Sequence, residues 1–150
     1  MAKNEWSLAQ LKSKAEIYCA AAEHCISDVR TKLSQWGATP EQYEEIIAHL
    51  LACKYIDEER FCRAYAHDKL IYQGWGRIKI GAYLHAKQLP SDAIHQALEE
   101  LDDIEYQKTL QHVIASKKRN LKSTDPMARE KLLRFCTQRG FTYEEISEYL

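Results

Sequence analysis

The sequence predicts an all-α protein made of three tandem three-helix repeats, which form an elongated, gently curved helical array. Two observations lead to this fold class. The 150 residues include only five glycines and three prolines, so residues that interrupt helices are scarce. A turn-like segment also recurs at offsets of 51 and 52 residues, as Leu33–Tyr43, Leu84–Ile94 and Cys136–Ile146. We therefore assign residues 1–55, 56–101 and 102–150 to repeats 1, 2 and 3.

Each recurring segment has the pattern of a helix end, a tight turn and a new helix start. Gly37 and Gly140 stand where the first helix would end in the left-handed conformation, which glycine adopts without a Cβ penalty. In these two copies a threonine follows two residues later, with Gln or Glu three positions beyond it, as in a capping box. These residues are Thr39 with Gln42 and Thr142 with Glu145. In the middle copy Gln88 takes the glycine position, where a left-handed backbone costs about 1 kcal/mol.

Apolar residues recur with helical spacing on both sides of each turn and again upstream of it. Each repeat therefore contains three amphipathic segments, and the chain contains nine in all. Asp57, followed by two glutamates, is suited to cap the first helix of repeat 2. Asp125, followed by Pro126, is suited to cap a helix in repeat 3.

Several classes of protein do not fit this sequence. The five cysteines form no CxxC pair, and we expect them to pack as small apolar side chains and to bind no metal. Phosphate-binding loops, zinc-protease motifs and EF-hand motifs are absent, so we predict neither an enzyme nor a cofactor. No run approaches 18 apolar residues, and the first residues lack the apolar core of a signal peptide. We therefore expect a cytoplasmic protein that does not interact with membranes.

Charge is distributed unevenly along the chain although the net charge is only −1. Residues 60–88 carry a net charge of +5 and residues 107–139 carry +7, and the segment between them, 89–106, carries −6. Such blocks can create local positive surfaces for nucleic acid or for acidic proteins. They can equally be solvated helix faces, and the sequence leaves both interpretations open.

A tryptophan held between two glycines marks the junction of two predicted helices in repeat 2. Two cations, Arg77 and Lys79, follow Trp75 closely. Trp75 can stack on a base or bury against a partner, while the cations contact phosphates or carboxylates. The alternative is that Trp75 folds back onto the core and anchors the turn.

These residues belong to a set of short motifs that occur in order along the chain. The set consists of Tyr55–Phe61, Tyr65, Gly74–Ile78, Leu84 with Lys87 and Leu89, and Arg134–Ile146. In this order and spacing the motifs resemble the signature of the RecX family, and the resemblance covers roughly residues 15–150. Gln88 departs from the pattern, because the family usually has glycine at that position.

The resemblance implies a bacterial regulator that binds the recombinase RecA and lies within the groove of its nucleoprotein filament. Such a regulator modulates strand exchange, ATP hydrolysis and the co-protease activity that triggers the SOS response, with inhibition as the expected direction. We expect it to act as a monomer, and its place in the filament groove would also allow contact with DNA. The residues that match the motifs and are candidates for the contact are Arg60, Trp75, Arg77, Lys79, Lys87 and Arg139.

Two other functions remain open at this point. The basic blocks and Trp75 also suit a helical module that binds single- or double-stranded nucleic acid directly. The repeat architecture suits a helical scaffold for some other protein partner.

Overall fold

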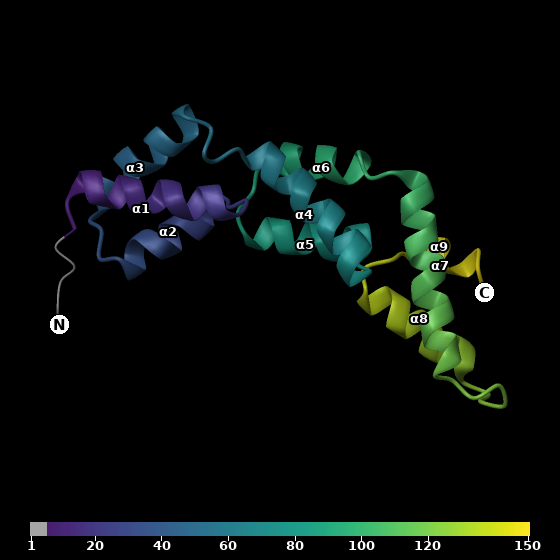
Figure 1. Cartoon of the computed structure of the whole chain (residues 1–150). Coiled ribbons are helices and arrows are strands. Elements are labelled where there is room, and N and C mark those ends of the chain that lie inside the picture. Colours follow the sequence, from purple (N-terminus) through teal and green to yellow (C-terminus); the bar gives the residue numbers. More distant parts are fainter. Residues whose placement is uncertain (1–5) are drawn as a thin grey trace.

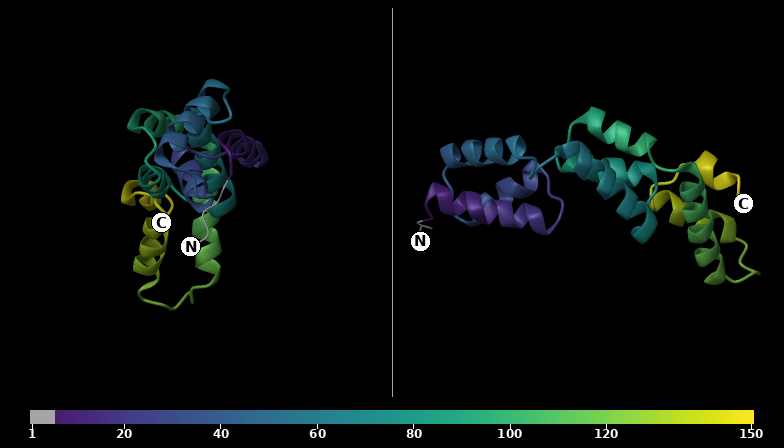
Figure 2. Two further views of the ribbon diagram at one scale, coloured as in Figure 1. Left: turned by 90° about the vertical axis from the view of Figure 1, so that its left-hand side faces the viewer. Right: turned by 45° about the horizontal axis from the view of Figure 1, so that its top comes forward.

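The computed structural model describes residues 6–150, and every regular element in that range is a helix. Unit 1 consists of α1 (Leu8–Ala21), α2 (Ile26–Gln35) and α3 (Pro40–Ala52). Unit 2 consists of α4 (Glu58–Gln73), α5 (Arg77–Ala86) and α6 (Ser91–Glu99). Unit 3 consists of α7 (Asp103–Arg119), α8 (Ala128–Gln138) and α9 (Tyr143–Ser147). The units follow one another along an elongated molecule, which confirms the predicted fold class, while the repeat boundaries stay a prediction (Figures 1 and 2).

The second helix of each unit ends in the same left-handed turn. Gly37, Gln88 and Gly140 have φ angles of 78°, 65° and 99°, so the middle repeat adopts this conformation without a glycine. In each turn the next residue donates its N–H to a carbonyl five residues earlier, as in a Schellman motif. These bonds run from Ala38 to Leu33 (2.9 Å), from Leu89 to Leu84 (3.3 Å) and from Phe141 to Cys136 (3.2 Å). The structure therefore confirms the repeat found in the sequence at the level of single hydrogen bonds.

Most of the predicted helix caps are also present. Both capping boxes form, at the start of α3 and at the start of α9. Asp57 accepts the N–H of Arg60 at 3.0 Å and caps α4. The prediction for Asp125 is wrong, because α8 begins at Ala128 with Met127 as its N-cap. Asp125 instead accepts the N–H of Met127 at 2.8 Å, and it stabilises the turn that precedes the helix.

The buried apolar side chains form two separate cores. Unit 1 has its own core, which includes Leu11, Leu33, Ile46, Leu50 and Ile56. Units 2 and 3 share one continuous core, which runs from Phe61 and Leu84 to Tyr106, Leu132 and Phe141. Cys25, at the start of α2, is the residue through which unit 1 joins this second core. Apolar packing is therefore extensive between units 2 and 3, whereas Cys25 is the one described residue of unit 1 in that shared core.

Four of the five cysteines pack as small buried side chains, as predicted, and Cys53 does not. Cys19, Cys25, Cys62 and Cys136 are buried, Cys53 is exposed, and all five are free thiols. Burial raises the pKa of the Cys19 and Cys62 thiols to about 11. Both thiols are therefore protonated near neutral pH and poorly nucleophilic.

Candidate partner-binding surface

The six residues predicted to contact a partner fall into two groups in the structure. Arg60, Lys87, Arg77 and Arg139 make polar contacts that connect neighbouring units. Trp75 and Lys79 instead lie together in a cluster of aromatic rings and ammonium groups on unit 2. Four of the five motif cations therefore connect neighbouring units, and Lys79 lies in the surface cluster.

Arg77 lies at the junction of units 2 and 3. Its Nε donates to the carbonyl oxygen of Leu98 at 3.1 Å, and its guanidinium lies 3.9 Å from the centre of the Tyr106 ring. Carboxylates of Asp103 and Glu145 lie at 3.6 and 3.7 Å. Because Tyr106 and both carboxylates belong to unit 3, Arg77 connects the two units and has little freedom to reach outward.

Tyr106 completes this junction from within the core. Its fully buried hydroxyl accepts the backbone N–H of Arg77 at 3.1 Å and donates to Glu145 at 3.4 Å. Burial raises the pKa of Tyr106 to about 12, against the lowering effect of the bond from Arg77. The hydroxyl therefore stays neutral and serves as donor and acceptor at once.

Arg139 and two glycines form the second connection between units 2 and 3. The N–H of Gly76 donates to the carbonyl of Arg139 at 2.7 Å, and the N–H of Ile78 donates to the carbonyl of Gly140 at 3.1 Å. The Arg139 guanidinium donates to the carbonyl of Gln73 at 2.8 Å. A Cβ added at Gly76 would lie 2.5 Å from the carbonyl oxygen of Gly140, so the two backbones cross in direct contact.

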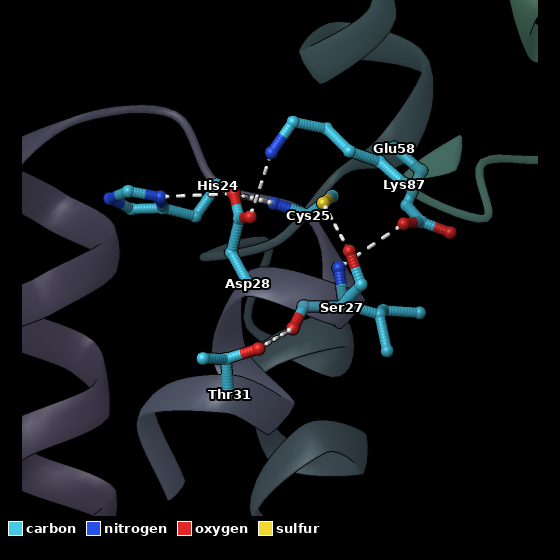
Figure 3. Close-up of polar contacts among 8 residues, drawn as sticks. His24, Cys25, Ser27, Asp28, Thr31, Glu58 and Lys87 are labelled. Carbon is cyan, nitrogen blue, oxygen red and sulfur yellow. Dashed lines mark hydrogen bonds and ion pairs between the residues drawn. The ribbon is translucent and has the colours of Figure 1, made fainter. Parts of the chain in front are cut away.

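Arg60 and Lys87 hold unit 2 against unit 1. Arg60 Nε lies 2.6 Å from a carboxylate oxygen of Glu23, and Lys87 Nζ lies 3.1 Å from a carboxylate oxygen of Asp28. Figure 3 shows Asp28 between Lys87 of unit 2 and His24 of unit 1, whose Nδ1 lies 3.2 Å from the other Asp28 oxygen. This junction is mainly polar, whereas the junction between units 2 and 3 combines polar contacts with a shared apolar core.

The ionisation of Asp28 follows from these contacts. Burial alone would raise the pKa of Asp28, but hydrogen bonds from Lys87, His24 and the Cys25 N–H outweigh burial and hold the pKa below its usual value. Burial lowers the pKa of Lys87, and the bond to Asp28 reverses this, so the net shift is upward. Both shifts favour the charged pair.

We expect this pair to stabilise the attachment of unit 1 in a pH-dependent way. The Asp28 contribution is complete above the pKa that the carboxyl has in the unfolded chain, and it is lost as the pH falls through the lower pKa of the folded state. A double-mutant cycle with Asp28→Asn and Lys87→Met should give a coupling free energy of about 0.5–1 kcal/mol at pH 7. Chemical unfolding at several pH values measures it.

A more exposed pair in unit 1 provides the control for this cycle. Arg30 and Glu44 lie 3.4 Å apart, and the Glu44 side chain is 73% exposed. The same cycle on that pair should give a coupling close to zero. Equal couplings at the two sites would show that the Asp28 contact adds nothing specific.

Trp75 is half-buried, which answers the question that the sequence left open. Its ring lies 4.7 Å from the ring of Tyr83, with Lys79 Nζ at 4.5 Å and Lys69 Nζ at 5.0 Å from its centre. Lys69 also lies 5.3 Å from the ring of Tyr65. We call these five residues the Trp75 cluster, which is an accessible site with two ammonium groups held by aromatic rings.

A related arrangement occurs on unit 1, where the sequence analysis did not find it. Lys14 Nζ lies 4.2 Å from the Trp6 ring and 4.9 Å from the Trp36 ring, and Lys32 Nζ lies 5.4 Å from the ring of Tyr18. A sequence signal does exist. Lysine and an aromatic residue stand four positions apart at 14/18, 32/36, 65/69 and 79/83, a spacing that places both on one helix face. The pair at 65/69 is in contact, whereas Lys14 and Lys32 reach Trp36 and Tyr18 between α1 and α2 of unit 1.

Comparison with known proteins agrees with this organisation. Residues 57–98 match the model of the RecX second three-helix domain, and residues 103–150 match the model of the third. The chain belongs to the RecX family. The first match holds Arg60, Trp75, Arg77, Lys79 and Lys87, and the second holds Arg139, so every predicted contact residue lies in a RecX domain.

Two relatives called regulatory protein RecX are similar to this chain over most of their length. The Herbaspirillum seropedicae protein is 25% identical over 92% of this chain and 87% of its own. The Pseudomonas fluorescens protein is 28% identical over 96% of this chain and 92% of its own. A role as a regulatory protein follows from this family.

Crystal structures of RecX proteins share the fold. The structure of a regulatory protein RecX superposes with a TM-score of 0.82 at 19% identity, over 93% of this chain and 73% of the other. RecX from Lactobacillus salivarius gives a TM-score of 0.78 at 17% identity, over 94% and 92% of the two chains.

Over the described range, no helix in this RecX-family chain is long and apolar enough to cross a membrane.

Proposed function

We propose that this chain regulates the recombinase RecA by binding along its nucleoprotein filament as a monomer in the cytoplasm, and that it lowers ATP hydrolysis, strand exchange and co-protease activity. The Trp75 cluster is the observation that carries the proposal. Among the six predicted contact residues, Trp75 and Lys79 are the two without a polar contact to another unit. The other four motif cations bond to neighbouring units of the array. The Trp75 cluster remains accessible on the central unit.

The chemistry of the cluster favours an anionic group on the partner. Lys69 and Lys79 both lie over the indole of Trp75, so a bound carboxylate or phosphate would meet two cations at once. Because the ring already carries two ammonium groups, stacking of a base on it is less favourable than ionic contact. A filament surface, which offers acidic side chains close to DNA phosphates, supplies such groups.

The test measures ATP hydrolysis by RecA on single-stranded DNA while this protein is titrated in. We expect the wild-type protein to lower the rate, and Lys79→Glu to require about tenfold more protein for the same effect, since a reversed charge at a contact costs on the order of 1.4 kcal/mol. Arg63→Glu, on the exposed face of α4 in the same unit, is the matched control and should act like the wild type. An unchanged rate at severalfold excess of protein over RecA would contradict the proposal.

A second candidate is direct binding of single-stranded nucleic acid through its phosphates, which the lysine ammonium groups on units 1 and 2 favour. It predicts that the protein binds an oligonucleotide without RecA, with affinity that falls steeply as salt rises. Fluorescence anisotropy on labelled oligo(dT) separates the two functions. If Lys79→Glu abolishes both oligonucleotide binding and the effect on the filament, direct binding of nucleic acid is sufficient to explain that effect.

A further inference from the structure

A groove of about 430 Å³ lies where the end of α4 meets α7 and α8, and Arg139 is the one predicted contact residue that lines it. Tyr72 and Gln73 of unit 2 form one side, and Lys108 and His112 of α7 form another. The groove therefore spans the junction of units 2 and 3, which the glycine crossing and the shared core hold in a fixed geometry. A site formed by two rigidly joined units needs little ordering before it binds a ligand.

The charged side chains that line the groove are cationic. Lys108 and Arg139 line it, and no aspartate or glutamate does. Seven of the lining residues belong to the most basic segment of the chain, residues 107–139, which carries a net charge of +7. One guanidinium nitrogen of Arg139 donates to the Gln73 carbonyl at 2.8 Å, which fixes the side chain. The other guanidinium N–H groups can bind a carboxylate.

The rest of the lining mixes uncharged polar residues with apolar ones, and the apolar part bears on which kind of anion binds. Val113 is buried, and Ile71 and Phe135 also contribute. Lys117 Nζ and the Arg139 guanidinium lie 4.9 and 4.8 Å from the centre of the Phe135 ring. Because cations already lie over this ring, it is a poor platform for a nucleobase, whereas the apolar surface can accept an aliphatic side chain.

We propose that this groove binds a short acidic peptide segment of a partner protein. Its carboxylates would contact Lys108 and Arg139, and an apolar residue between them would pack against Val113. This inference does not rest on the effect on RecA, because a peptide in solution tests it without any filament.

The experiment uses the whole protein and a fluorescein-labelled peptide, Asp-Glu-Asp-Leu-Phe-Glu-Asp-Glu, followed by fluorescence anisotropy at 0.05 and 0.15 M salt. We expect saturable binding that Lys108→Glu weakens about tenfold. Lys118→Glu introduces the same charge change on the same helix but outside the groove, and it should weaken binding less than twofold. A peptide with Gly-Ser in place of Leu-Phe should also bind more weakly.

Three outcomes would overturn the proposal. The first is no binding of the peptide at low salt. The second is equal weakening by Lys108→Glu and Lys118→Glu, which would mean that the peptide senses only the overall positive charge. The third is displacement of the peptide by oligo(dT), with oligonucleotide binding lost in Lys108→Glu, which would make the groove a phosphate site.

Discussion

Gly76→Ala is expected to lower the free energy of unfolding by about 3 kcal/mol. The added Cβ would lie 2.5 and 2.6 Å from the carbonyl oxygen and carbon of Gly140 and 2.8 Å from the nitrogen of Phe141. All three are backbone atoms, so no side-chain rotation relieves the clash. Overpacking of this kind costs about 1–3 kcal/mol, and separating Gly76 from Arg139 also breaks a 2.7 Å hydrogen bond, worth about 1 kcal/mol.

The measurement is urea unfolding of the wild type and the variant, with Gly81→Ala as the control. A Cβ at Gly81, within α5, meets only the end of the Leu98 side chain, at 3.3 Å. Alanine is favoured over glycine inside a helix by about 1 kcal/mol, so this control should be neutral or slightly stabilising. Equal stabilities of the two variants would show that the backbone crossing is not tight.

Arg77→Ala is expected to cost about 2–3 kcal/mol of stability. A hydrogen bond from a charged group is worth about 1.5–3 kcal/mol, and the stacking on Tyr106 adds about 0.5–1 kcal/mol. Arg77→Lys should recover only part of this loss, because an ammonium cannot stack on the ring and reach the Leu98 carbonyl in the same way. Arg63 is exposed, and the stability of the Arg63→Ala variant should stay within about 0.5 kcal/mol of that of the wild type.

Arg77 is also the residue for which contact and structural roles can be distinguished most directly. Unfolding and the filament assay are to be measured on the same preparations of Arg77→Ala. If Arg77 acts by holding units 2 and 3 together, stability falls first, and any loss of activity accompanies it. A variant of full stability that has lost its effect on RecA would assign Arg77 to the partner contact instead.

Local chemistry made the turns and most of the caps predictable. Gly37, Gly140 and the two threonine capping boxes need only neighbours within a few residues, and the alignment of the repeats extended the left-handed turn to Gln88. Asp125 shows the limit of such reasoning, since an aspartate followed by proline can stabilise a turn before a helix as well as cap it.

The partners of the motif cations could not be predicted in the same way. Arg77 reaches a carbonyl 21 residues away, Lys87 a carboxylate 59 residues away, and Arg139 a carbonyl 66 residues away. Two of these acceptors are backbone groups, which every residue carries and no sequence pattern marks. The separation of the unit 1 core is equally invisible in sequence, because the apolar periodicity is similar in all three repeats.

Because unit 1 has its own core, we expect the molecule to unfold as two cooperative blocks, of which unit 1 is the weaker. Unit 1 is attached mainly by ionic contacts, so we expect high salt or acid to loosen it while the apolar core shared by units 2 and 3 persists. Transient opening of the N-terminal third then leaves both the Trp75 cluster and the basic groove intact. Amide protons of α1–α3 would accordingly exchange with solvent before those of α4, α5 and α7, and damage to the first repeat would be confined to it.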